Sequence, residues 1–209
     1  MPRTFLAVAL LLATAACKPT PPALSPEMRE AMREIEQRAR AEEARRPRIT
    51  TLNDDAWRAI PDDQLDEAVM AFVQARIHGQ IGAAKPLAAM PRGFQVFHLS
   101  FLVEMEVADG GFNQFFWNSS GEAAALVPDA LRALGADEAA SLFEQVLVVA
   151  DRDLPRRAPF KAQGSLQAFS ESYKGSPLNA YDDPFMKLAV KFPALRVAYL
   201  KRNAEQFHE

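Results

Sequence analysis

The most concentrated polar chemistry of the chain lies in residues 106–121, which read EVADGGFNQFFWNSSG. Carboxyl and amide side chains stand here beside three phenylalanines and a tryptophan, a mixture that suits either a ligand site or difficult packing. Acid–base catalysis requires only well-placed groups with shifted pKa values, so Glu104, Asp109 and Asn113 could serve a hydrolase. Glu104 and Glu106 are two positions apart, however, and would point to different faces of a helix rather than form a carboxylate pair.

Other catalytic patterns are absent from the sequence. It has no HExxH, no paired histidines at i,i+4, no GxSxG and no P-loop motif. Its three histidines, His78, His98 and His208, fit a helix end, a helix interior and a chain end. Cys17 is the only cysteine, which excludes an intramolecular disulfide. We therefore expect a protein that is not an enzyme and that requires no cofactor or metal ion.

The same stretch also has a structural interpretation. Gly110 and Gly111 predict the end of a helix, because glycine adopts positive φ without penalty. Ser119 and Glu122 have the spacing of a capping box, in which the two side chains satisfy the start of the next helix. The residues between these signals fit one face of a helical turn or two: Phe112, Phe115 and Phe116.

The polar residues left over admit two interpretations. A buried amide without a partner costs about 1–3 kcal/mol, so each must be exposed or hydrogen-bonded. The amides could satisfy backbone groups that the glycine pair frees, or they could contact a partner or ligand. The candidate partner-binding residues of the stretch are Asp109, Asn113, Gln114, Trp117 and Asn118.

Helical periodicity predicts one all-α domain over residues 53–207, long enough for a single core. Residues 94–107 are apolar nearly all round, which indicates a central buried helix. Residues 151–164, DRDLPRRAPFKAQG, are predicted to form a basic loop broken by prolines. The predicted helices of the domain cover residues 62–78, 94–107, 128–135, 137–150, 165–173 and 193–207. Gly135 and Ala136 predict an antiparallel hairpin of the third and fourth helices, with Asp137 as the cap of the fourth.

The motif resembles the signature of the DNA-mimic protein C-terminal domain family, an all-helical and largely uncharacterised group. Asp109 stands where the family pattern usually has Asn, and the resemblance extends over about residues 62–203. The matching residues are Glu106-Val107, Gly110-Gly111-Phe112, Gln114-Phe115-Phe116, Asn118-Ser119-Ser120-Gly121 and the run from Ala130 to Ala136.

The resemblance implies an acidic surface, because DNA mimics occupy the DNA-binding surface of a protein with carboxylates that imitate phosphates. Residues 49–151 hold 15 acidic and 5 basic residues, a net charge of −10, whereas residues 152–209 carry a net charge of +4. Within the densest acidic cluster, Asp62, Asp63 and Asp66 are further candidate partner-binding residues. Carboxylates are also favoured at helix N-termini for local reasons, which is the competing interpretation.

The N-terminus, MPRTFLAVALLLATAACKPT, has the pattern of a bacterial lipoprotein signal peptide over residues 1–16. Its apolar run is too short to span a bilayer, and small residues precede Cys17, the predicted site of lipid attachment. The alternative is an ordinary signal peptide, cut after Thr14-Ala15-Ala16. A proline-rich tether follows over residues 17–26, then a charged helix and linker over residues 27–48.

These features predict that the protein is located in the cell envelope. Lys18 stands where Asp would favour retention at the inner membrane, so we expect a lipid anchor in the outer membrane with the domain facing the periplasm. Because an exported domain does not meet chromosomal DNA, the expected partner is a basic protein and not nucleic acid. The alternatives are a small-molecule or peptide-binding lipoprotein with a pocket near Trp117, and a structural envelope protein that self-associates through residues 27–46.

Overall fold

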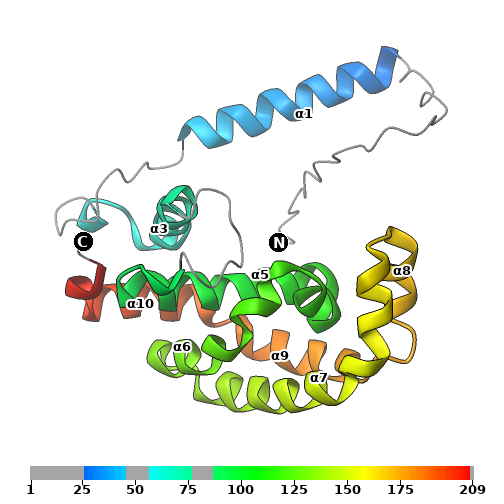
Figure 1. The fold of residues 1–209 in the computed structure, drawn as a ribbon. Coiled ribbons are helices and arrows are strands. Elements are labelled where there is room, and N and C mark those ends of the chain that lie inside the picture. The colour runs from blue at the N-terminus through cyan, green and yellow to red at the C-terminus, as the bar shows by residue number, and fades with distance from the viewer. Residues whose placement is uncertain (1–25, 46–56, 77–86, 208–209) are drawn as a thin grey trace. The chain divides into compact units, whose positions relative to one another are not determined.

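The computed structural model describes residues 26–45, 57–76 and 87–207 (Figure 1). Contacts divide the chain into two units, residues 1–45 and 46–209, which are described separately. The predicted signal peptide, lipid attachment site and tether up to residue 25 lie outside the described residues. All regular structure in the described ranges is helical, which confirms the predicted all-α fold class. None of the helices in these ranges is long and apolar enough to cross a membrane.

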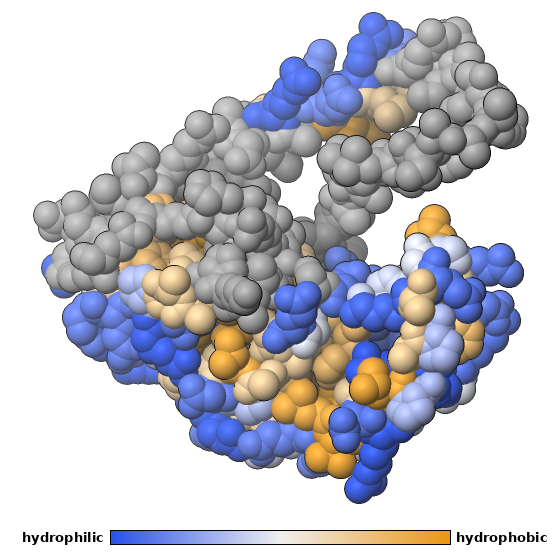
Figure 2. Space-filling model, in the orientation of Figure 1, coloured by the Kyte–Doolittle hydropathy of each residue, from blue (hydrophilic) through white to orange (hydrophobic). Residues whose placement is uncertain are grey.

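The described part of the first unit is one helix, α1 (Pro26–Arg45), which confirms the predicted charged helix. Glu34 pairs with Arg38 at 3.6 Å and Glu36 pairs with Arg40 at 4.0 Å, both with i,i+4 spacing. Such exposed pairs stabilise a helix by only about 0.3–0.5 kcal/mol each. Figure 2 shows hydrophilic residues on one side of this helix and apolar residues on the other. The apolar side includes the exposed residues Met28, Met32 and Ile35.

The second unit is built around α5 (Arg92–Trp117), the buried helix that the apolar run predicts. In Figure 1, α5 runs through the middle of the unit, with α3 (Asp62–Arg76) on one side and α6 (Val127–Leu134) and α7 (Asp137–Gln163) on the other. Its first half is covered by α3 and by α10 (Phe192–Arg202). Contact on several sides explains why the sequence of α5 is apolar nearly all round.

A break at Gly110 and Gly111 divides α5, as the sequence predicts. Gly111 has φ of 67° and ψ of −176°, a conformation that essentially only glycine adopts. The turn redirects the following phenylalanines into the core. There the Phe112 ring packs against Phe143 and Phe185, with centroid distances of 5.7 and 5.1 Å.

The predicted hairpin of two helices is present as α6 and α7, which pack against each other. Pro128 lies in the first turn of α6, and Gly135 ends the helix with φ of 91°. The prediction that Asp137 caps α7 is wrong by one residue. Because the chain returns directly to helix after Gly135, Ala136 takes the cap position and Asp137 lies in the first turn.

The predicted loop over residues 151–164 is wrong, because α7 continues through Pro155 and Pro159 to Gln163. Figure 1 shows α7 bending along its length towards α8 (Leu166–Ser172). A proline removes one backbone hydrogen bond and usually kinks a helix. Tertiary contacts offset that loss here: Arg156 donates to the Ser172 carbonyl at 2.9 Å, and other basic side chains of this segment contact α5.

The last part of the unit consists of short helices. Ser165 caps α8 by accepting a hydrogen bond from the Ala168 amide at 3.1 Å, within the predicted range of 165–173. The sequence analysis did not predict α9 (Asp182–Ala189), a helix of eight residues that packs on α5. The predicted last helix ends early, since α10 stops at Arg202. The remaining elements are 3₁₀ helices: η1 (Ser119–Leu126), η2 (Pro177–Tyr181) and η3 (Ala204–Phe207).

Candidate functional site

The motif that opened the sequence analysis converges on the buried side chain of Glu106. Gln114 and Asn118 donate their amide N–H groups to Glu106 Oε2 at 3.0 and 2.8 Å, and Ser120 donates its hydroxyl to Oε1. Glu106 is only 3% exposed. Three donors on one side chain suit the carboxylate form, which only accepts hydrogen bonds. This group, the Glu106 network, joins α5 before the break to α5 and η1 after it.

The backbone groups freed at the glycine break find partners far along the chain. The Tyr173 hydroxyl donates to the Gly110 carbonyl at 2.6 Å, and the Phe112 amide donates to Asp182 Oδ1 at 2.8 Å. Burial raises the pKa of Asp182, and the Phe112 hydrogen bond acts in the opposite direction. The hypothesis that the motif amides satisfy these backbone groups is therefore wrong: Tyr173 and Asp182 do so, and the amides bind side chains.

The third amide of the motif also faces inward. Asn113 is 4% exposed and donates to the Ser172 hydroxyl at 2.6 Å, and that hydroxyl donates to the Phe169 carbonyl at 2.6 Å. This chain of bonds ties the second half of α5 to α8. Each of the three amides therefore has a hydrogen-bond partner inside the molecule.

The predicted cap position is wrong by one residue. The η1 helix begins at Ser119 with Asn118 in the cap position, and the Asn118 side chain makes no cap hydrogen bond. Glu122 is exposed at its first turn. Because Asn118 and Ser120 are drawn to Glu106, the chain enters η1 one residue earlier than the capping pattern predicts.

The other two candidates of the motif lie closer to solvent. Asp109 is exposed just before the break. Trp117 is half-buried at the end of α5, where its ring meets Phe169 edge-on at 5.1 Å. The structure thus brings Asn113 and Trp117 together in the lining of one pocket, turns Gln114 towards Glu106, and leaves Asp109 outside that group.

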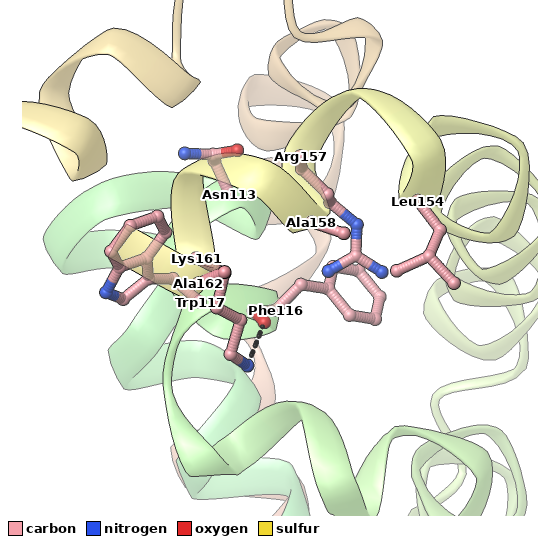
Figure 3. A pocket seen from close by; sticks show the side chains of 8 residues that line it. All are labelled: Asn113, Phe116, Trp117, Leu154, Arg157, Ala158, Lys161 and Ala162. Carbon is pink, nitrogen blue, oxygen red and sulfur yellow. Dashed lines mark hydrogen bonds between the residues drawn. The ribbon is translucent and has the colours of Figure 1, made fainter. Parts of the chain in front are cut away.

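A pocket of about 210 Å³ lies beside Trp117, between the second half of α5 and the C-terminal half of α7 (Figure 3). Lys161 spans one side of it, donating to the Phe116 carbonyl at 2.9 Å. Trp117 and Asn113 were predicted from the sequence, whereas the α7 side was not, because that segment was predicted to be a loop. The residues that line the pocket are Asn113, Phe116, Trp117, Leu154, Arg157, Ala158, Lys161 and Ala162.

The predicted acidic cluster lies at the start of α3, and two of its members are paired within the molecule. Asp62 accepts from Lys201 at 2.5 Å at the surface. Asp66 accepts from both Nε and Nη2 of Arg196, at 2.7 and 2.8 Å. Asp63 is exposed and has no ion pair within the part of the chain that the structure describes.

Arg196 is the centre of a second buried polar group. It is 1% exposed, and besides Asp66 it binds Glu104 at 2.7 Å. Burial lowers the pKa of Arg196, but hydrogen bonds and charges from Asp66 and Glu104 outweigh it and raise the pKa above its ordinary value. This arrangement, the Arg196 ion pairs, joins α3, α5 and α10. It also commits Glu104, one member of the hydrolase hypothesis, to a structural contact.

The fold and this site define a small all-α domain organised around a buried carboxylate at a helix break. A family model described as DMP19-like protein matches residues 88–203, and the chain belongs to this family. The match confirms the resemblance to DNA-mimic proteins that the motif carries. No curated protein and no solved structure matches the chain.

Proposed function

We propose that this protein is a lipid-anchored component of the cell envelope whose helical domain binds a basic protein partner and catalyses no reaction. The support for the anchor is the sequence pattern that ends at Cys17. The support for a binding role is membership of the DMP19-like family together with the charge of the domain surface. The proposed partner lies in the periplasm, because the signal pattern directs the domain out of the cytoplasm.

The observation that most supports the binding role is the excess of exposed negative charges on the N-terminal part of the domain. Among the side chains of residues 57–151 whose exposure the structure describes, two basic ones are exposed, Arg58 and Arg132, against ten acidic ones. Such an excess of one sign creates a potential that steers oppositely charged partners. The exposed acidic residues of the same part are Asp62, Asp63, Glu67, Asp109, Glu122, Asp129, Asp137, Glu138, Glu144 and Asp151.

The ion pairs within the molecule refine which acids are candidates for partner contact. Asp66 holds Arg196, so its substitution would disturb the fold and would not report on binding. Asp63, Asp137 and Glu138 are exposed, and none has an ion pair within the described part of the chain. These three side chains are therefore the suitable ones to neutralise.

The test is non-covalent capture from a periplasmic extract, with the protein as bait, at low and at high salt. We expect specific partners that are lost at high salt and reduced at least several-fold by Asp63→Asn with Asp137→Asn and Glu138→Gln. The matched control is Asp183→Asn with Glu205→Gln, which neutralises exposed acids in the net-positive C-terminal part. If the amount of captured partner changes neither with salt nor with the first set of substitutions, the acidic surface is not the binding face.

The anchor has its own test. Membrane fractionation of cells that express the wild-type chain is expected to place it with the outer membrane, and labelled fatty acid is expected to attach at Cys17. Cys17→Ser removes the only thiol of the chain and should release the protein from the membrane fraction. A Cys17→Ser protein that stays in the membrane fraction contradicts lipid anchoring.

A further inference from the structure

The pocket beside Trp117 has walls that are chiefly apolar. Phe116, Trp117 and Leu154 supply aromatic and aliphatic surface, and Leu154 is 46% exposed at its edge. Pockets for drug-sized ligands are commonly about 300–1,000 Å³, so a pocket of about 210 Å³ suits a smaller compound. A ring or a short aliphatic chain would fill such a space and be removed from water.

The charged groups of the same walls are two cations, Arg157 and Lys161. Among the residues that the structure describes, neither has a carboxylate within ion-pair distance, and the lining contains no acidic residue. Asp153, which acts on the charge of Arg157, is held by two bonds from Arg156, at 2.6 and 2.8 Å. The lining itself is therefore positively charged, and acidic residues act on it only from outside the lining.

Not all hydrogen-bond donors of the Arg157 guanidinium have a partner within the described part of the chain. Its guanidinium lies over the Phe116 ring at 5.0 Å, and Nη2 donates to the Ala150 carbonyl at 3.3 Å. Its Nε is buried and has no hydrogen-bond partner. Buried donors are rarely left unpaired, so the Arg157 guanidinium is held here at a cost in free energy. Burial lowers the pKa of both Arg157 and Lys161, a cost that a bound anion would offset.

We infer that this pocket binds a small carboxylic acid with an aromatic or short aliphatic body, the carboxylate meeting Arg157 and Lys161 and the body packing against Trp117. A carboxylate matches the planar fork of a guanidinium. The mainly apolar walls favour an acid with a carbon body over a bare inorganic anion. The site is distinct from the acidic residues of α3 and the start of α7, so it is independent of the proposed partner surface.

The first experiment compares ligands on the unmodified full chain by calorimetric titration. Sodium phenylacetate is expected to bind saturably, and phenylacetamide, which has the same body without the charge, about tenfold or more weakly. Inorganic phosphate is expected to bind far more weakly than phenylacetate. Equal binding of the acid and the amide, equal binding of phosphate, or no saturable binding of phenylacetate would overturn the inference.

The second experiment locates the site with variants. Arg157→Met and Lys161→Met are each expected to weaken phenylacetate binding about tenfold, whereas Arg152→Met, an exposed cation on the same helix, should leave it unchanged. Circular dichroism checks that each variant is folded. If Arg157→Met does not fold, the affinity of Lys161→Met decides the outcome. The Trp117 indole NMR signal should shift on binding, with Trp117→Phe as its assignment control. Unchanged affinity in the folded variants places the ligand elsewhere and contradicts the inference.

Discussion

Glu104 and Glu106 lie two residues apart on the same helix, yet they are stabilised in opposite ways. Glu106 is met by neutral donors from residues 114, 118 and 120, all in the same motif. Glu104 is met by the charge of Arg196, 92 residues further along the chain. The first arrangement is local and is visible as a sequence signature, whereas the second is formed only by the tertiary fold.

The difference shows that the polar side chains of the family motif are used mainly for contacts within the fold. Its amides and hydroxyl face the Glu106 carboxylate and hold the helix break in place. Its chemistry is therefore largely used inside the molecule. The proposed binding therefore involves the surfaces around the motif, which are the exposed acids and the pocket that begins at Trp117.

The largest expected loss of stability follows from replacing Arg196. Arg196→Leu leaves Asp66 and Glu104 partly buried without their cation, and we expect a loss of about 3–5 kcal/mol in the free energy of unfolding. Lys201→Met breaks the exposed pair with Asp62 and should cost less than about 1 kcal/mol. Denaturant unfolding of the two variants measures both values, and equal costs would contradict the central role of Arg196.

A third ionisable group on α5 sharpens the comparison, because His98 is buried and its Nδ1 has no hydrogen-bond partner. Burial lowers its pKa from 6.5 to about 4. Between these values the unfolded chain binds a proton that the folded chain does not, so the stability falls as the pH falls through this window. The lowered pKa corresponds to a loss of about 3 kcal/mol.

The measurement for His98 is the free energy of unfolding at pH 7 and pH 4.5, in the wild type and in His98→Leu. Other titrating groups contribute to both proteins and cancel in the difference. We expect the wild type to lose about 2–3 kcal/mol more than the variant over this range. The same pH dependence in both proteins would show that His98 is not the group that titrates.

The break itself gives an expected effect of similar size. Gly111→Ala places a Cβ where φ is 67°, and that Cβ would overlap the Asp182 carboxylate. We expect a loss of about 2–3 kcal/mol in the free energy of unfolding. Gly135→Ala is the control, since its φ of 91° is also positive but no atom lies within 4 Å of the added Cβ. If the two variants lose the same stability, the close approach of Asp182 is not what requires glycine.

The sequence predicts the parts of the fold that local signals determine. The glycine break and the turn at Gly135 both follow from residues with a known conformational preference. The phenylalanines of the motif were likewise correctly assigned to the core. The helical character of the whole domain follows from its periodicity.

Long-range contacts account for what the sequence analysis missed. The continuation of α7 through two prolines depends on Arg156, Arg157 and Lys161 reaching other helices, which no local pattern records. Half of the pocket was missed for the same reason. The partners of the glycine break, Tyr173 and Asp182, are 63 and 70 residues away from it.

The Glu106 network is tested most directly by a double-mutant cycle with Glu106→Met and Ser120→Ala. The network predicts that each single change is destabilising, and that Ser120→Ala costs little once Glu106 is gone, with a coupling energy of about 1–2 kcal/mol. Denaturant unfolding of the wild type, the two single variants and the double variant measures it. Additive losses, with no coupling between the two side chains, would contradict the claim that the motif is turned inward to hold the fold.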